Sequence, residues 1–170
     1  MSLPRVGVSA CLLGRPVRYD GDSRPHAWIR DVLPGYAQLS PICPEMEAGL
    51  GVPRPPVQLV LAGGQVRALG VADSRLDVTR VLSAWVREQK SRLEVLDALI
   101  LKSRSPSCGL GDVPLFNGER EGLREHQDGL FAGWVREHLP HLVLYSDVWL
   151  EESRQQTAFL SLLMKKNAGS

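Results

Sequence analysis

Short apolar runs that end at turn residues are the feature of this sequence that most restricts its fold. Three of them lie at residues 5–10, 38–42 and 98–102. Runs of this length, without polar alternation, are typical of strands buried on both faces of a parallel sheet. Because parallel strands need long crossover connections, we expect helices between the runs.

Segments with apolar residues at helical spacing lie between and after these runs. Residues 77–96 predict one amphipathic helix, with Asp77 as a cap for its start. Residues 129–138 and 151–166 predict two further helices, and residues 142–145 another strand. Around Gly63 and Gly64, residues 57–62 and 65–71 indicate a β-hairpin or strand pair.

Strands that alternate with helices predict an α/β fold. We expect a single domain over residues 1–170, with a mainly parallel sheet flanked by helices in a Rossmann-like three-layer arrangement. Ligands of such sheets bind beyond the carboxyl ends of the strands. Cys11, Cys43 and Cys108 each follow one of the three apolar runs. The cysteines are therefore expected at the carboxyl ends of strands, where they can meet.

Charge and hydropathy exclude several classes of protein. The formal net charge is +1, so no global basic field would attract a nucleic acid polymer or an acidic membrane. The N-terminus lacks the pattern of a signal peptide, and no apolar stretch approaches the length of a membrane span. We expect a cytoplasmic protein, in which cysteines stay reduced. The oligomeric state stays open, with a monomer as one option.

The cysteine pattern is unlike that of disulfide or zinc proteins. Three cysteines are an odd number, and no Cys-x-x-Cys pair is present. Glycine, proline or serine stands within three residues of each of them, which suits a tight backbone around a bulky inorganic group. A shared metal or cluster site, a catalytic cysteine and three unrelated buried thiols all remain open at this point.

Three thiolates would have a specific consequence if they held an iron–sulfur cluster. Clusters that transfer electrons usually have a cysteine on every iron. A cubane cluster bound by three cysteines keeps one iron without a protein ligand, and that iron is a Lewis acid with an open position. The number of cysteines therefore favours catalysis over electron transfer, provided that a cluster binds.

A few polar residues near the cysteines are candidates for further roles. Glu45, two residues after Cys43, suits a general acid or base, or an ordinary carboxylate near a helix start. Asp20 is typical of a turn, whereas Arg18 and Tyr19 could line a pocket. The four histidines show no metal-ligand spacing, and Glu47 is expected to be solvated.

Four motifs together resemble a bacterial family that includes thiouracil desulfidases and was long labelled a domain of unknown function. They are Ser-Ala-Cys-Leu-Leu-Gly from Ser9, Arg-Tyr-Asp-Gly from Arg18, Cys-Pro-Glu from Cys43 with Gly-Leu-Gly-Val-Pro-Arg after it, and Leu-Lys-Ser-Arg-Ser-Pro-Ser-Cys-Gly from Leu101. The resemblance runs from about Val6 to about Gly109.

The resemblance implies a cofactor, a reaction and site residues. The cofactor is an oxygen-labile 4Fe-4S cluster held by Cys11, Cys43 and Cys108, and its open iron would accept the sulfur of 2-thiouracil or a similar small thioamide. Glu45 would move protons, and Ser105 would assist. Substrate contacts are expected from Ser9, Arg18, Tyr19, Asp20, Ser103 and Ser107. A non-catalytic cluster or sulfur carrier, a redox sensor and a cluster-free binding module are the alternatives.

Overall fold

The computed structural model describes residues 2–119 and 121–169 and contains a four-stranded parallel sheet. The strands of this sheet are β1 (Arg5–Ser9), β2 (Gln38–Ile42), β5 (Ala98–Leu101) and β8 (Val143–Ser146), in the order β2-β1-β5-β8. All of their pairings are parallel. The α/β fold with a mainly parallel sheet is thereby confirmed. Pro41 is tolerated in β2 because β2 is an edge strand.

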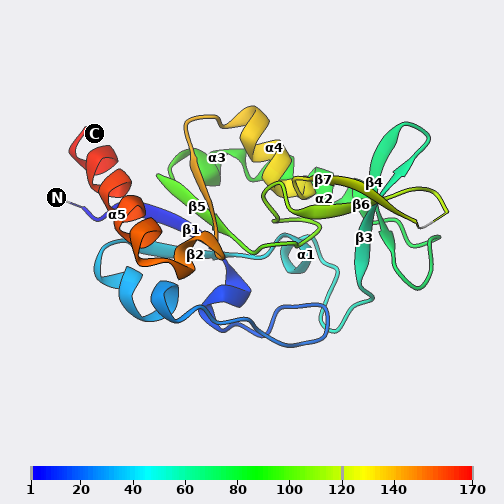
Figure 1. The fold of residues 1–170 in the computed structure, drawn as a ribbon, viewed down its shortest axis with the longest axis horizontal. Coiled ribbons are helices and arrows are strands. Elements are labelled where there is room, and N and C mark those ends of the chain that lie inside the picture. The colour runs from blue at the N-terminus through cyan, green and yellow to red at the C-terminus, as the bar shows by residue number, and fades with distance from the viewer. Residues whose placement is uncertain (1, 120, 170) are drawn as a thin grey trace.

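Helices cover both faces of this sheet (Figure 1). One face carries α5 (Ser153–Ala168), the π-helix η2 (Trp28–Val32) and the short η3 (Leu33–Gly35), which pack on Val8 and Ile100. The other face carries α2 (Thr79–Glu88), α3 (Lys90–Glu94) and α4 (Leu130–His138), which pack on Leu99 and Leu101. Successive side chains along a strand thus point to opposite faces of the sheet and pack into two separate apolar cores, as expected for a three-layer arrangement.

A second four-stranded sheet lies at the other end of the long axis (Figure 1). It contains β3 (Val57–Ala62), β4 (Gln65–Gly70), β6 (Val113–Phe116) and β7 (Gly122–Gln127), in the order β4-β3-β6-β7. The expected hairpin is confirmed as β3–β4, and Gly63 and Gly64 supply the two positive φ angles, 59° and 77°, of its turn. Strands β6 and β7 were not predicted, because Pro114 interrupts one and the other is mostly polar.

The single helix expected over residues 77–96 is wrong, because the chain breaks at Gln89 into α2 and α3. The Gln89 side-chain amide donates to the carbonyl oxygen of Trp85 at 3.2 Å and so takes up an orphan acceptor at the end of α2. The N-cap of α2 is Val78 rather than the expected Asp77, but the Asp77 carboxylate still accepts the N–H of Thr79, the first residue of α2, at 3.0 Å.

The order of the strands reverses next to β1, which is flanked by β2 on one side and β5 on the other. Beyond the carboxyl ends of these strands lie the 3-10 helix η1 (Ala10–Leu13), α1 (Pro44–Glu47) and the loop after β5. A further 3-10 helix, η4 (Trp149–Glu151), follows β8. A reversal of this kind opens a crevice at the edge of the sheet, where α/β proteins bind ligands. Among the described residues, no helix is both long and apolar enough to cross a membrane.

Gly129 sets how closely the start of α4 approaches the loop after β5. A Cβ atom at Gly129 would lie 2.4 Å from the carbonyl carbon of Ser107 and 2.8 Å from the nitrogen of Cys108. Because both atoms belong to the backbone, the loop or the helix would have to move. Contacts from the backbone N–H groups of Leu130 and Phe131 to the carbonyls of Pro106 and Ser107, both 2.9 Å, would then be disturbed.

We therefore expect Gly129→Ala to destabilise the chain by about 1–3 kcal/mol, as overpacking typically does. This corresponds to a fall of roughly 3–10 °C in the midpoint of thermal unfolding. Gly35→Ala is the matched control, since a Cβ at Gly35 meets no atom within 4 Å. Circular dichroism melts of both variants test this, and equal midpoints would contradict the packing argument.

Candidate active site

All three cysteines line one cavity of about 370 Å³ at the carboxyl edge of the parallel sheet. Cys11 lies in η1 directly after β1, Cys43 stands between β2 and α1, and Cys108 lies in the loop after β5. Cys11 and Cys108 are buried, Cys43 is partly buried, and all three are free thiols. A cavity of this size falls within the range of small-molecule sites, about 300–1,000 Å³.

Hydrogen bonds fix the backbone that carries Cys108. The Ser105 hydroxyl oxygen accepts the N–H groups of Ser107 at 3.2 Å and of Cys108 at 3.1 Å. At the start of the same loop, Arg104 has a φ of 61°, and its N–H donates to the Asp112 carboxylate at 3.0 Å. A left-handed turn at a residue other than glycine needs such support from its surroundings. These contacts hold the Cys108 thiol at the cavity.

Burial makes thiolates costly at this site. Desolvation raises the pKa of Cys11, Cys43 and Cys108 alike. Nearby groups oppose the rise in pKa: Lys102 and Arg18 at Cys11, and a hydrogen bond from Ser9 at Cys108. Burial therefore favours the protonated form of Cys11, Cys43 and Cys108, and a metal that binds these thiols has to displace their protons.

The arrangement of the thiols fits a cluster better than a single ion. Within residues 2–119 and 121–169, no group of three or more His, Cys, Asp or Glu side chains could hold one metal ion. In an iron–sulfur cluster each thiolate binds a different iron, so the sulfurs need to share a cavity without sharing one atom. Cys11, Cys43 and Cys108 meet this requirement.

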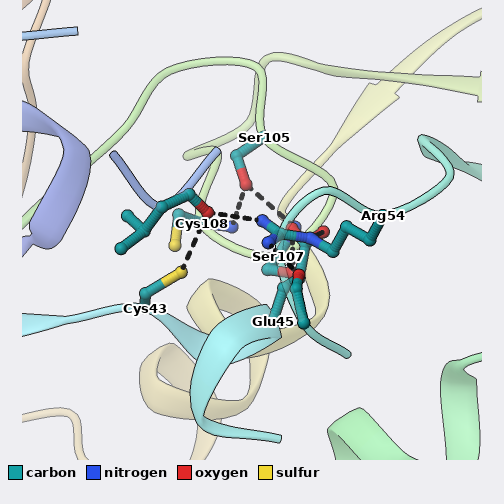
Figure 2. Close-up of polar contacts among 8 residues, drawn as sticks. Cys43, Glu45, Arg54, Ser105, Ser107 and Cys108 are labelled. Carbon is teal, nitrogen blue, oxygen red and sulfur yellow. Dashed lines mark hydrogen bonds and ion pairs between the residues drawn. The ribbon is translucent and has the colours of Figure 1, made fainter. Parts of the chain in front are cut away.

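Glu45 lies in the same cavity, in the first turn of α1 (Figure 2). The Arg54 Nε donates to its Oε1 at 3.2 Å, and the Ser107 hydroxyl donates to its Oε2 at 3.1 Å. The side chains of Arg54 and Glu45 are only 6% and 14% exposed. A carboxylate that faces the thiols from a largely desolvated ion pair is available to exchange protons with a bound ligand.

The other expected site residues divide into two groups. Ser9, Arg18, Tyr19, Ser103 and Ser105 line the cavity with the cysteines and Glu45. Asp20 and Ser107 lie outside its lining. The Asp20 carboxylate accepts the Asp22 N–H at 3.0 Å in an exposed turn, and the buried Ser107 hydroxyl is directed to Glu45. Asp20 thus takes the turn role that its sequence context favours.

Three basic residues of the cavity, Arg54, Lys102 and Arg104, had no role in the sequence analysis. Arg54 lies in a proline-rich segment whose composition indicates only a rigid loop. The position of an arginine between prolines is the one sequence signal that could have singled it out. Lys102 ends an apolar strand, and its ammonium group contacts the Ser103 hydroxyl at 3.0 Å and lies 3.9 Å from the buried Asp147 carboxylate. Val17, which accepts from Arg54, and Asp147, near Lys102, are distant from these residues in sequence.

Glu47, expected to be solvated, is exposed but makes two contacts. Its carboxylate accepts the Cys43 N–H at 3.0 Å and pairs with Arg92 at 2.5 Å. These contacts tie the last residue of α1 to the Cys43 backbone and to α3.

Some known proteins are similar to this chain in sequence, and one solved structure is also similar in fold. Residues 6–147 match the family model described as 2-thiouracil desulfurase. An uncharacterised protein of Bacillus subtilis (strain 168), YbbK, is 29% identical over 136 residues, which cover 76% of this chain and 88% of YbbK. A solved structure of TudS, a 4Fe-4S-dependent thiouracil desulfidase, is 31% identical with a TM-score of 0.70; the match covers 92% of this chain and 99% of TudS.

The cysteine-lined cavity lies in the matched part of the chain, since Cys11, Cys43, Glu45 and Cys108 all fall between residues 6 and 147. Because that model spans most of the sequence, the chain belongs to the 2-thiouracil desulfurase family.

Proposed function

We propose that this protein is a desulfidase that removes the sulfur of 2-thiouracil or a similar small thioamide. The observation that carries the proposal is the meeting of three free thiols and Glu45 in one cavity, in a chain of the 2-thiouracil desulfurase family. The similarity to TudS, a 4Fe-4S-dependent enzyme, supports the same cofactor here.

Cys11, Cys43 and Cys108 would hold a 4Fe-4S cluster. When bound by three cysteines, such a cluster supplies one iron with an open position, a Lewis acid able to accept the sulfur of the substrate. The raised pKa values of the thiols fit this role, because buried thiolates form only when a cation offsets their charge.

The net reaction is a hydrolysis without change of redox state. A water oxygen forms the new bond to the thioamide carbon, the carbon–sulfur bond breaks, and the products are the oxo base and hydrogen sulfide. Glu45 takes a proton from the attacking water and returns it to the leaving group or the base. Ser105 assists with its hydroxyl, which lines the cavity while its oxygen accepts two backbone N–H groups.

The remaining lining residues would position the substrate. Ser9, Arg18, Tyr19 and Ser103 surround the cavity. Arg18 is the strongest of these candidates, because its Nε is buried and has no hydrogen-bond partner among the described residues. An unpaired donor in such a place is ready to bind a carbonyl oxygen of a pyrimidine.

Residues 1–170 would work as one unit on a small molecule, in the cytoplasm. The cavity draws on the edge of the first sheet and, through Val57 at the start of β3, on the second. A site built from both sheets requires that they fold together.

Loss of a single thiol tests the cofactor. We expect Cys11→Ala, Cys43→Ala and Cys108→Ala each to abolish cluster binding after anaerobic reconstitution, since each removes one of only three ligands. Iron and acid-labile sulfide analysis gives the result, and circular dichroism verifies folding. A folded variant that keeps its full iron content would show that the altered cysteine is not a ligand.

Glu45→Gln separates catalysis from cluster binding. The amide keeps the shape of the side chain but cannot accept a proton, so we expect full iron content and a turnover of 2-thiouracil reduced about a hundred- to ten-thousand-fold. Uracil formation is measured by chromatography. Glu94→Gln, on the exposed face of α3, is the control and should leave turnover unchanged. Wild-type turnover in the Glu45→Gln variant would remove Glu45 from the mechanism.

A further inference from the structure

Both carboxylate oxygens of Glu45 are engaged by buried side chains. Arg54 donates to Oε1 and Ser107 to Oε2, and these donors are 8% and 1% exposed (Figure 2). A carboxylate held on both oxygens has a single orientation, whereas one held on a single oxygen can rotate about its terminal torsion. The two donors thus fix the direction in which Glu45 faces the cavity.

Arg54 is itself held by backbone carbonyls of its own loop and of one distant segment. Its two terminal nitrogens donate to the oxygens of Gly51 and Val17, both at 2.9 Å. The backbone N–H of Arg54 donates to the backbone carbonyl oxygen of Tyr19 at 2.8 Å. The planar guanidinium presents its donors in a rigid fork, so these bonds determine where its Nε can meet Glu45.

The Val17 carbonyl links this arrangement to the cysteines. It accepts a hydrogen bond from Arg54 and lies 3.9 Å from the Cys43 Sγ, which can donate to it only while the thiol keeps its proton. Glu45 and Cys43 are two residues apart along the chain, and Arg54 joins them a second time through space. The carboxylate therefore keeps a set position relative to the thiol group.

From these contacts we propose that Arg54 is a positioning residue for the reaction, and that it acts through Glu45 with Ser107 as its counterpart on the other oxygen. The inference rests on the proposed function and assigns Arg54 a task within it. A buried ion pair contributes little net stability compared with apolar packing, so stability alone does not account for a charged pair at this place. Correct orientation of an acid–base group does, because small displacements of such a group are costly to the rate.

The split between kcat and KM tests this role. We expect Arg54→Gln and Arg54→Lys to retain the cluster and to bind 2-thiouracil with a KM within about threefold of the wild type. We expect kcat to fall by about a hundredfold, the scale of a misplaced catalytic group. Lysine is included because it keeps the charge but not the fork of donors. A loss of iron, or a rise in KM with unchanged kcat, would overturn the proposal.

Arg67→Gln is the control for the general effect of breaking an ion pair. It removes the contact of Arg67 with Asp77, a partly exposed pair between β4 and the start of α2 that lies outside the cavity lining. Its kcat should equal that of the wild type. If Arg67→Gln lowers kcat as much as Arg54→Gln does, Arg54 has no special position.

A double-mutant cycle tests the partnership without any turnover. Urea unfolding of the cluster-free chain is measured for Arg54→Gln, Glu45→Gln and the double variant. If the two side chains act as a pair, the double variant loses less stability than the sum of the two single losses. Additive shifts would contradict the pairing. If the wild type fails to desulfurise any thiopyrimidine while the cycle shows coupling, then the proposed function fails and the contact stands.

Discussion

The parallel pairing of β1 with both β2 and β5 is the constraint on which the site depends. Val6 lies opposite Leu39 on one side and Ala98 on the other, so the three strands run in register and finish at one edge. Their carboxyl ends deliver Cys11, Cys43 and Cys108 to a single cavity. Residues that are far apart in sequence thereby become neighbours, and the turn after each strand determines how its thiol faces the others.

Electrostatics complement this geometry. The cavity gathers thiols whose neutral form is favoured by burial, a carboxylate, and the cations Arg18, Arg54, Lys102 and Arg104. Arg54 forms an ion pair with Glu45, and Lys102 lies near Asp147. Arg18 keeps a donor that is free among the described residues. The protein thus places a cation beside the Glu45 carboxylate and keeps one Arg18 donor uncommitted among the described residues, while burial favours the protonated form of the thiols.

The sequence was sufficient to predict the parts that depend on local pattern. Buried strands, the turn at Gly63 and Gly64, and the placement of the cysteines after strands all follow from apolar runs and turn residues. The contact of Arg54 with Glu45 could not be found in this way, because it joins a proline-rich loop to a helix through tertiary packing. Strand β6 was missed for a related reason: pairing with β3 overrides the unfavourable Pro114.

If Cys11, Cys43 and Cys108 hold the proposed 4Fe-4S cluster, one of its irons has no protein ligand. Mössbauer spectroscopy of the anaerobically reconstituted, isotope-enriched protein tests it most directly, with and without 2-thiouracil. We expect the Mössbauer signal of one iron to differ from those of the others and to shift when thiouracil is added. A cluster in which no iron signal changes on addition of thiouracil, or a folded chain that takes up no iron, would contradict this expectation.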